Sequence, residues 1–560
     1  MNENRRRRTV NPPAPAMSGR REARRRQVPQ LMTRLTVLMT RLYYVRLARS
    51  GVVLALAALS VLAALPAANA QSDAKSSAAG HAGAAIVVDL NASSHPFPHF
   101  WEQMYGSGRA VLSLRESYRD DLRDVKRVTG FQYIRFHGIF LDEVGLYDED
   151  KDGKPVYNFS YVDQIYDGLL KNHVRPFVEL SFMPNKLTSD PKAIQAFWYK
   201  PNVGPPKDWD KWGQLVEAFV RHLVQRYGED EVAAWYFEVW NEPNLDFWAG
   251  EPRQSTYYQL YDQAAGAIKR VSARLRVGGP ATAQAAWADS FLAHCKANNI
   301  PVDFVSTHVY GNDRAEDVFG THEVIPRNQM VCRAVNKVHQ QILASPYPQM
   351  PLIWSEFNAD YSNQTQVTDS AYIGPWMADT IRQCDGLTQM MSYWDFSDVF
   401  EEQGVVKRPF YGGFGLLAEN DLPKPSFNDF ALLHKLGDVR LDLDSESALV
   451  TKRTDGAIVV AVWGKIVPPE EQPSGDDVVR LEFKGLAFKH SARVTVVDDD
   501  HGSPLPLYKK MGSPQFLTRS QIEELRAAAS LPAAKTMPLQ GSTLTLRLPS
   551  HALALVEIDR

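Results

Sequence analysis

The chain alternates short apolar runs with amphipathic stretches, which predicts an α/β fold, a (β/α)8 TIM barrel with an accessory C-terminal β-sandwich domain. Between residues 100 and 435, strand-like runs are separated by segments whose apolar residues recur at spacings of three and four. After residue 436 the pattern changes to alternating apolar and polar residues broken by turn residues, which is typical of antiparallel strands. No glycine-rich phosphate loop follows the first strand, so a nucleotide-binding fold is disfavoured.

Eight strands separated by helices favour a closed barrel over an open sheet. The strand candidates are 102–106, 133–138, 175–182, 235–243, 276–281, 303–311, 352–358 and 390–398. The helix candidates between them include 117–128, 209–228 and 256–275. We therefore assign residues 100–435 to the catalytic barrel.

The second unit is expected to span residues 436–560, as a β-sandwich with one inserted helix that begins at Thr518. The apolar run AIVVDL, within residues 85–99, stands apart from the barrel series and is expected to join this sandwich. Residues 71–84 are small and polar, which indicates a linker.

The amino end has the composition of an export signal. An arginine-rich stretch runs into the apolar segment 51–65, and the small residues PAANA precede Gln71. We predict a signal peptide at 1–70 with a long basic n-region, hence a periplasmic or secreted protein. A membrane anchor and a nucleic-acid-binding arm are the alternatives, but the apolar run is shorter than the roughly 20 residues that cross a bilayer. No stable membrane anchor is expected after cleavage.

Charge argues against a polyanionic partner. Removal of residues 1–70 would take away 13 arginines and two glutamates, which changes the formal net charge from −3 to −14. A chain this acidic is a poor candidate for binding nucleic acid.

The chain has three cysteines, Cys295, Cys332 and Cys384, and an odd number leaves at least one thiol unpaired. Their spacing matches no metal motif. We expect buried thiols, with one disulfide as the alternative in an oxidising compartment.

Polar residues close several of the apolar strand runs. In a (β/α)8 barrel such residues converge at the carboxyl ends of the strands, where the chemistry of this fold takes place. They include Arg135, His137, Asn241, Glu242, His308, Tyr310, Glu356, Asn358, Tyr393, Trp394 and Asp395.

Two carboxylic acids stand out in this set. Glu242 lies in FEVWNEPNL and Glu356 in LIWSEFN, both in apolar and aromatic surroundings. Burial raises the pKa of a carboxyl group, which suits Glu242 to give a proton at neutral pH. Two carboxylates beside aromatic, amide and imidazole groups suit cleavage of a glycosidic bond. Glu238 lies deeper on the same strand face, and there we expect a buried hydrogen-bonded network.

Five motifs in order, FEVWNEPNLDFW, YIRFHG, DFVSTHVYG, WSEFN and SYWDFSDVFEE, resemble family 39 of the glycoside hydrolases. Members of this family include β-xylosidases and α-L-iduronidases. The resemblance covers about residues 85–560. A lone NEP would be shared across many barrel enzymes, whereas the ordered set is specific.

The resemblance implies a role for each matched residue. Glu242 corresponds to the general acid/base and Glu356 to the nucleophile of a retaining double displacement, which needs carboxyl groups about 5–5.5 Å apart. Asn241 corresponds to the residue that bonds the sugar 2-hydroxyl. The residues implied in substrate binding are His137, Asn241, His308, Tyr310, Trp394, Glu401 and Glu402.

We therefore predict an exo-acting β-xylosidase that releases xylose from the non-reducing ends of xylo-oligosaccharides. No cofactor and no metal are expected, because two carboxylates and water suffice. Alternatives are an endo-acting exopolysaccharide glycosidase, an α-L-iduronidase-like enzyme, and a carbohydrate-binding protein without catalysis. The oligomeric state is left open.

Overall fold

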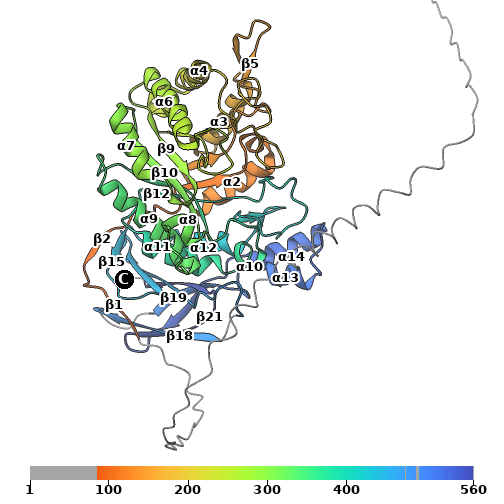
Figure 1. The fold of residues 1–560 in the computed structure, drawn as a ribbon. Helices are drawn as coiled ribbons and strands as arrows, with labels where there is room; N and C mark the ends of the chain where they lie inside the picture. The colour runs from red at the N-terminus through yellow and green to blue at the C-terminus, as the bar shows by residue number, and fades with distance from the viewer. Residues whose placement is uncertain (1–84, 473–474, 487–490, 559–560) are drawn as a thin grey trace, which may run out of the picture. The chain divides into compact units, whose positions relative to one another are not determined.

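The computed structural model describes residues 85–472, 475–486 and 491–558, and Figure 1 shows their ribbon. The predicted signal peptide and linker lie outside these residues. Within the part of the chain that is described, no helix combines the length and the apolar character that a membrane crossing needs.

Eight strands close into a parallel barrel, which confirms the predicted fold class. Around the barrel the strands are β3 (Met104–Ser107), β4 (Tyr133–Phe136), β7 (Arg175–Leu180), β8 (Tyr236–Val239), β9 (Arg276–Thr282), β10 (Phe304–Tyr310), β11 (Leu352–Asn358) and β12 (Met390–Tyr393). Each strand overlaps one of the predicted runs.

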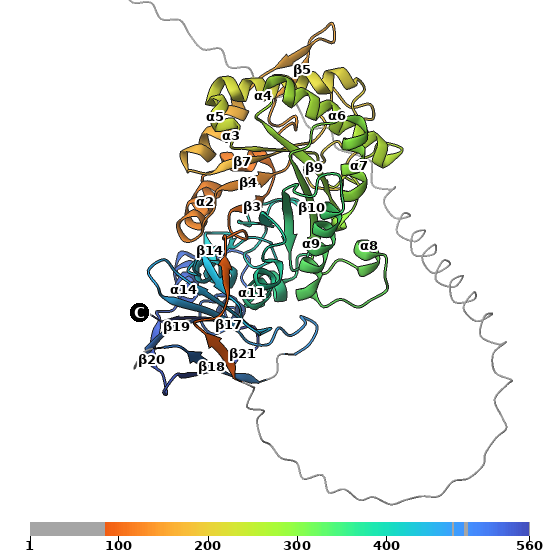
Figure 2. The ribbon, with the colours of Figure 1, turned by 90° about the vertical axis from the view of Figure 1, so that its left-hand side faces the viewer.

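Helices follow the strands and surround the barrel (Figure 2). The main ones are α2 (Glu116–Val128), α3 (Ser160–Lys171), α4 (Trp209–Tyr227), α6 (Arg253–Val271), α7 (Ala288–Asn298), α9 (Arg327–Leu343), α11 (Ile373–Cys384) and α12 (Pro425–Leu433). One of the two longest predicted helices, α4, shows why they form. Asp208 caps α4 by accepting hydrogen bonds from the backbone N–H groups of Asp210 and Lys211, and Gly228 ends it with a φ of 85°. Its apolar face, which includes Trp212 and Phe219, is fully buried.

Large side chains fill the amino-terminal part of the barrel interior. They form one cluster contributed by six strands: Met104, Phe177, Tyr236, Phe304, Ile353 and Met390. This apolar layer closes the barrel from below. Polar side chains nearer the carboxyl ends of the strands therefore rest on a packed floor rather than on a water-filled pore.

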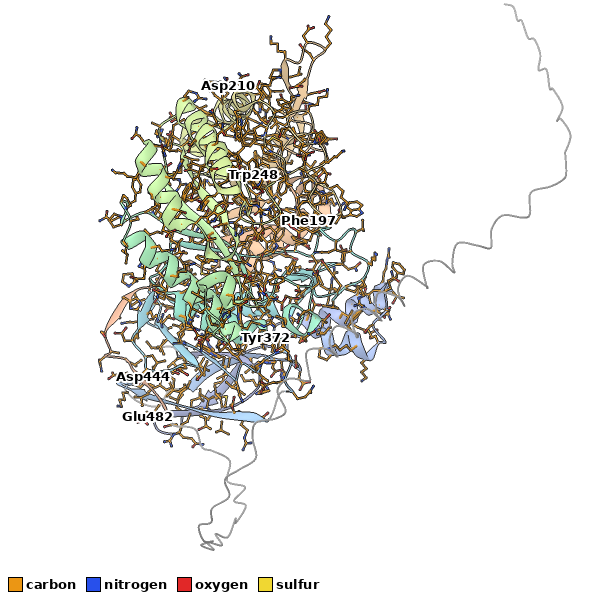
Figure 3. The ribbon with its side chains drawn as sticks, viewed as in Figure 1. Phe197, Asp210, Trp248, Tyr372, Asp444 and Glu482 are labelled. Carbon is orange, nitrogen blue, oxygen red and sulfur yellow. A yellow bond between two sulfur atoms is a disulfide. The ribbon has the colours of Figure 1, made fainter. Side chains whose placement is uncertain are left out.

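The sandwich consists of two sheets that enclose a separate core. The larger sheet contains, in order, β2 (Ser94–Pro96), β15 (Val439–Leu441), β16 (Ala448–Lys452), β17 (Ile458–Trp463), β22 (Leu553–Ile558), β19 (Ser491–Val497) and β20 (Lys535–Pro538). The smaller sheet contains β1 (Ile86–Asp89), β18 (Asp476–Lys484) and β21 (Thr543–Pro549). Residues 86–96 thus supply an edge strand to each sheet, and β1 runs parallel to β18. Figure 3 shows Asp444 and Glu482 in this unit.

Helices α11 and α12 pack against strands β17, β19 and β22 of the sandwich. Tyr372, labelled in Figure 3, lies at the start of α11. Its ring is edge-on to that of His551, with centroids 5.3 Å apart. The apolar core of the barrel continues into this contact, because Leu449, Val459 and Leu555 belong to the same cluster as the barrel helices. The accessory sandwich is therefore packed onto the barrel.

Two sequence expectations were wrong. The sandwich carries two inserted helices rather than one, α13 (Leu505–Lys510) and α14 (Arg519–Ala529), because the short run LPLYKK forms a turn of helix over the buried Leu505 and Tyr508. Thr518 does cap the second, as predicted.

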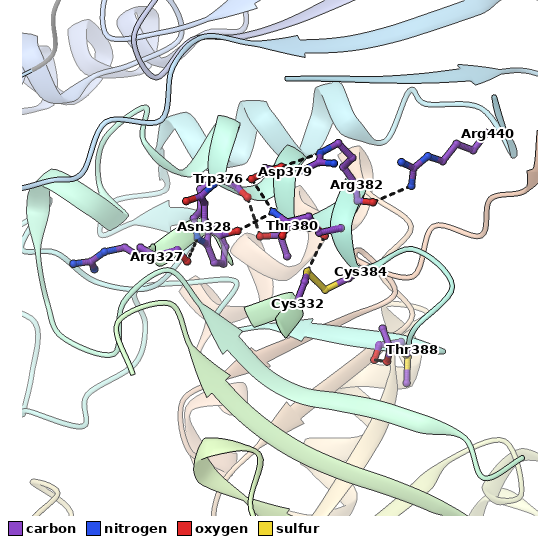
Figure 4. The surroundings of a disulfide bond; sticks show 12 residues. Arg327, Asn328, Cys332, Trp376, Asp379, Thr380, Arg382, Cys384, Thr388 and Arg440 are labelled. Carbon is purple, nitrogen blue, oxygen red and sulfur yellow. Dashed lines mark hydrogen bonds and ion pairs between the residues drawn. A yellow bond between two sulfur atoms is a disulfide. The ribbon is translucent and has the colours of Figure 1, made fainter. Parts of the chain in front are cut away.

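The second correction concerns the cysteines. Cys332 of α9 and Cys384 of α11 form a disulfide (Figure 4), so only Cys295 keeps a buried thiol. Their spacing of 52 residues gave no sign of pairing, since only the packing of α9 on α11 brings them together. Closing a loop of that length restricts the unfolded chain, a stabilisation of about 4 kcal/mol in the chain-entropy account.

Candidate active site

The residues predicted from sequence lie at the carboxyl ends of five barrel strands. They are His137 after β4, Asn241 and Glu242 after β8, His308 and Tyr310 on β10, Glu356 on β11, and Trp394, Glu401 and Glu402 after β12. Tyr310 is partly exposed and all the others are buried.

Glu242 and Glu356 face each other. One carboxylate oxygen of each lies, together with a ring nitrogen of His308, in a group whose atoms are within 4.8 Å of one another. The barrel thus brings two carboxyl groups that are 114 residues apart in the sequence close to each other.

The carboxylate of Glu356 receives a donor on each oxygen. Arg135 Nη1 donates to Oε1 at 2.6 Å and the Tyr310 hydroxyl donates to Oε2 at 2.7 Å. Burial raises the pKa of Tyr310, and the charge of Glu356 raises it further, so the phenol keeps its proton. With a donor on each oxygen, the carboxylate of Glu356 is held in a fixed orientation.

The surroundings of Glu242 differ from those of Glu356. Burial raises its pKa well above the ordinary value, and the negative charge of Glu356 adds to the effect. Its Oε1 lies 3.1 Å from His308 Nδ1. The backbone here adopts the left-handed region, with φ of 74° at Trp240 and 43° at Glu242, a strained conformation of the kind found at functional sites.

Arg135, which the sequence placed among the strand-end polar residues without a role, is the centre of the charge network. Its guanidinium, which is fully buried, donates to Glu238, Glu356 and Asn241 and pairs with Glu179 at 2.7 Å. An arginine inside an apolar strand, opposite strands that each carry a glutamate, is the signal that could have found it.

Asn241 is oriented by this arginine. Arg135 Nη2 donates to Asn241 Oδ1 at 2.8 Å, so the amide oxygen is used inside the network. The two N–H groups of the amide then remain for an acceptor such as a sugar hydroxyl.

His137 links three parts of the site. Its Nδ1 lies 2.8 Å from Glu179 Oε2 and its Nε2 lies 3.7 Å from Glu402 Oε1. Its ring is 4.9 Å from that of Trp394. Trp394 can lie this close to β3 because Gly106 has no side chain, since a Cβ at that position would meet the indole at 2.1 Å.

The neighbours Glu401 and Glu402 have different surroundings. Burial raises the pKa of Glu402 well above normal, and the charge of Glu356 reinforces this. Both oxygens of Glu401 are instead engaged by Arg109 at 3.1 Å and Arg115 at 2.6 Å. Glu402 thus lies beside His137, whereas Glu401 is held by ion pairs.

Two clusters of described residues have the donor types of a metal site. They are Glu242 with His308 and Glu356, and His99 with Glu102 and His434. In the second cluster Glu102 accepts from His99 at 2.7 Å and from His434 at 2.8 Å. A hydrogen bond joins Glu242 to His308 in the first cluster, and two join the histidines to Glu102 in the second, so we assign no ion to either.

A (β/α)8 barrel with two facing carboxyl groups at the ends of β8 and β11 is the arrangement of a glycoside hydrolase. The family model described as "Glycosyl hydrolases family 39" matches residues 84–543. The chain belongs to this family.

Two β-xylosidases are similar in sequence to most of the chain, and a solved β-xylosidase structure has the same fold. A β-xylosidase of Geobacillus stearothermophilus is 37% identical over 83% of this chain and 93% of its own. One of Caldicellulosiruptor saccharolyticus is 38% identical over 77% of this chain and 88% of its own. A crystal structure of a monomeric β-xylosidase from Caulobacter crescentus superposes with a TM-score of 0.77 at 34% identity, covering 85% of this chain and 99% of that one.

Proposed function

We propose that the protein is a retaining, exo-acting β-xylosidase that removes xylose from the non-reducing ends of xylo-oligosaccharides. The observation that carries this proposal is the pair of facing carboxyl groups with opposite environments. Burial and the charge of Glu356 raise the pKa of Glu242, while Glu356 receives two hydrogen bonds. The similarity to the two curated β-xylosidases supports the choice of sugar.

The reaction takes two displacements. Glu356 attacks the anomeric carbon from the α face while Glu242 gives its proton to the departing oxygen, which leaves an α-linked glycosyl-enzyme. Glu242, now ionised, removes a proton from water, whose oxygen attacks from the β face and releases Glu356. The product has the β configuration of the substrate. A hydrogen bond from Asn241 to the sugar 2-hydroxyl strengthens in the transition state.

The charges of the site favour a neutral sugar. A uronic acid such as iduronate needs a cation to hold its carboxylate. Arg135 is fully buried and shared among glutamates, and Arg109 and Arg115 are paired with Glu401. With these guanidinium groups engaged, an α-L-iduronidase-like activity is disfavoured.

The loop between β7 and α4 supports exo action. The backbone N–H of Trp198 donates to the carbonyl of Glu402 at 2.7 Å, and the ring of Phe197 lies over His137 at 6.4 Å. Arg109 lies 5.7 Å from the Trp198 ring and 5.0 Å from the Tyr199 ring. The loop thereby forms a wall beside the residues assigned to the terminal sugar, which suits a site that accepts chain ends.

A substrate panel tests the proposal. Among aryl β-xylosides, β-glucosides, α-arabinosides and α-iduronides, the xyloside is expected to give the highest kcat/KM. From xylo-oligosaccharides labelled at the reducing end, we expect xylose to be released one unit at a time while the label stays on the shortened chain. Proton NMR of the first product is expected to show β-xylose.

Other outcomes would identify the alternatives. Release of internal fragments from a polysaccharide would indicate an endo-acting enzyme, and preferred cleavage of the iduronide would indicate the uronate activity. A first-formed α anomer would contradict the double displacement. Binding of xylo-oligosaccharides without cleavage of any glycoside would indicate a carbohydrate-binding protein.

We also propose that the chain is exported and cut before Gln71. The disulfide between Cys332 and Cys384 supports export, because such bonds persist in oxidising compartments. Amino-terminal sequencing of protein from the exported fraction is expected to begin at Gln71. The same protein, unfolded without reductant, should expose one thiol, that of Cys295. Retention in the cytoplasm, or three titrating thiols, would contradict the proposal.

A further inference from the structure

Strand β11 contains a β-bulge directly before the proposed nucleophile, Glu356. His308 of β10 pairs with Glu356 of β11, whereas Thr307 pairs with Trp354, so Ser355 is an extra residue opposite that step. In a regular strand Ser355 and Glu356 would point to opposite faces. The bulge lets both side chains contact groups inside the barrel.

Ser355 continues a chain of hydrogen bonds that starts at Glu242. His308 Nδ1 lies 3.1 Å from Glu242 Oε1, and His308 Nε2 lies 3.1 Å from Ser355 Oγ. The Ser355 hydroxyl donates to Glu238 Oε1 at 2.6 Å, and Arg135 Nε donates to Glu238 Oε2 at 2.6 Å. All five side chains are buried.

The direction of these bonds fixes the proton on His308. Since the hydroxyl hydrogen of Ser355 is used toward Glu238, Ser355 Oγ can only accept from His308, which requires an Nε2–H group. Burial lowers the pKa of His308 well below normal, and the charge of Arg135 lowers it further, so the ring is neutral. Its Nδ1 then carries a lone pair, which accepts a hydrogen bond from protonated Glu242.

The remaining charges near the pair come from the neighbouring strands. The groups that act on Glu242 are Glu356, Asp313, Arg135 and Glu179. Arg135 and His137 lower the pKa of His308, and Glu356 Oε1 lies 3.6 Å from its Nδ1. Burial raises the pKa of Glu238, which the ion pair with Arg135 opposes. That pair supplies the acceptor at the end of the chain.

We propose, on the basis of the proposed function, that Ser355 and Glu238 are positioning residues that hold His308 in the Nε2–H tautomer. The Nδ1 lone pair stabilises the acid form of Glu242 in the free enzyme, and this hydrogen bond breaks when the proton moves to the departing oxygen. After Glu242 has given up its proton, the same lone pair offers its carboxylate no donor, which makes Glu242 a stronger base toward water. One fixed tautomer thus serves both steps.

The variant Glu238→Gln tests this directly. Arg135 Nε faces Oε2, so the amide oxygen is expected to take that place and the NH2 group to face Ser355. The chain then reverses: the amide donates to Ser355, Ser355 donates to His308 Nε2, and His308 Nδ1–H donates to Glu242. Because this bond favours the ionised acid, the basic limb of kcat/KM against pH is expected to move down by about one unit or more.

The tautomer of His308 can be measured by NMR without any substrate being cleaved. In protein labelled with ¹⁵N-histidine, the ring of His308 can be assigned among the 14 histidines by comparison with His308→Gln. We expect the nitrogen shifts of an Nε2–H ring in the native protein and of an Nδ1–H ring in Glu238→Gln. If no glycoside is cleaved, the proposed function fails while these shifts still test the inference.

Two further variants separate positioning from loss of stability. Ser355→Ala removes the acceptor for His308 Nε2–H and is expected to move the basic limb of the pH profile to lower pH. Ser355→Thr keeps the hydroxyl, so its basic limb should lie at the native pH. Ser392→Ala is the matched control, because its buried hydroxyl on β12 has no hydrogen-bond partner among the described residues. The inference is overturned if native His308 is an Nδ1–H ring or an imidazolium at neutral pH. It is also overturned if Ser355→Ala and Glu238→Gln leave both the tautomer and the pH profile unchanged.

Discussion

Replacement of Glu356 by alanine is expected to lower kcat on aryl β-xylosides by about five orders of magnitude, because it removes the group that forms the covalent intermediate. Such a loss corresponds to about 7 kcal/mol of transition-state stabilisation. Tyr310 and Arg135 would lose one acceptor each. Since Arg135 keeps Glu238 and Glu179 as partners, the barrel should still fold.

Azide turns this variant into a stereochemical test. The shortened side chain leaves room on the α face of the sugar, where azide can attack the anomeric carbon while Glu242 still protonates the departing oxygen. The product expected by NMR is therefore α-xylosyl azide. Residual activity within tenfold of the native enzyme, or a β-configured azide, would assign the nucleophile elsewhere.

A control variant tests whether loss of any glutamate would lower the activity. Glu323 lies on the surface, where it pairs with Arg333. Its replacement by alanine removes only a solvent-exposed ion pair, which contributes little to stability. We expect full activity and a closely similar melting temperature, measured beside Glu356→Ala.

The strands and their polar ends could be predicted because each depends on local sequence. An apolar run predicts a buried strand, and the polar residues at its end predict where the site lies. Such runs end in His137, in Asn241 and Glu242, and in Glu356. Side-chain partners depend on which strands become neighbours, and periodicity does not carry that information. Arg135 is the example, since its three carboxylate partners come from three different strands.

Local irregularities of the backbone could not be predicted from the sequence either. The two-residue alternation of a strand places Ser355 away from the site, and the bulge brings it back. Glu401 and Glu402 look equivalent in the motif. Glu401 has a positive φ of 69° and pairs with arginines that are far away in the sequence, whereas Glu402 lies 3.7 Å from His137 Nε2.

Removal of the proton donor is expected to have the second largest effect. In Glu242→Ala, kcat on a substrate with a poor leaving group, such as xylobiose, should fall by about 10²–10⁴-fold, the usual contribution of general acid–base catalysis. A dinitrophenyl xyloside needs little protonation of its leaving group. Its first step should be nearly unaffected, so the glycosyl-enzyme is expected to accumulate and to appear as a burst of phenolate.

The pH dependence separates Glu242 from every other acid of the site. Burial and the charge of Glu356 raise its pKa, so the acid form is present below that raised pKa and is lost as the pH rises through it. The native enzyme should therefore lose activity on xylobiose along a basic limb, and Glu242→Ala should lack that limb. Azide, entering on the β face of the intermediate, should give β-xylosyl azide, the opposite anomer to that expected from Glu356→Ala. If both variants gave the same anomer, the two carboxyl groups could not lie on opposite faces of the sugar.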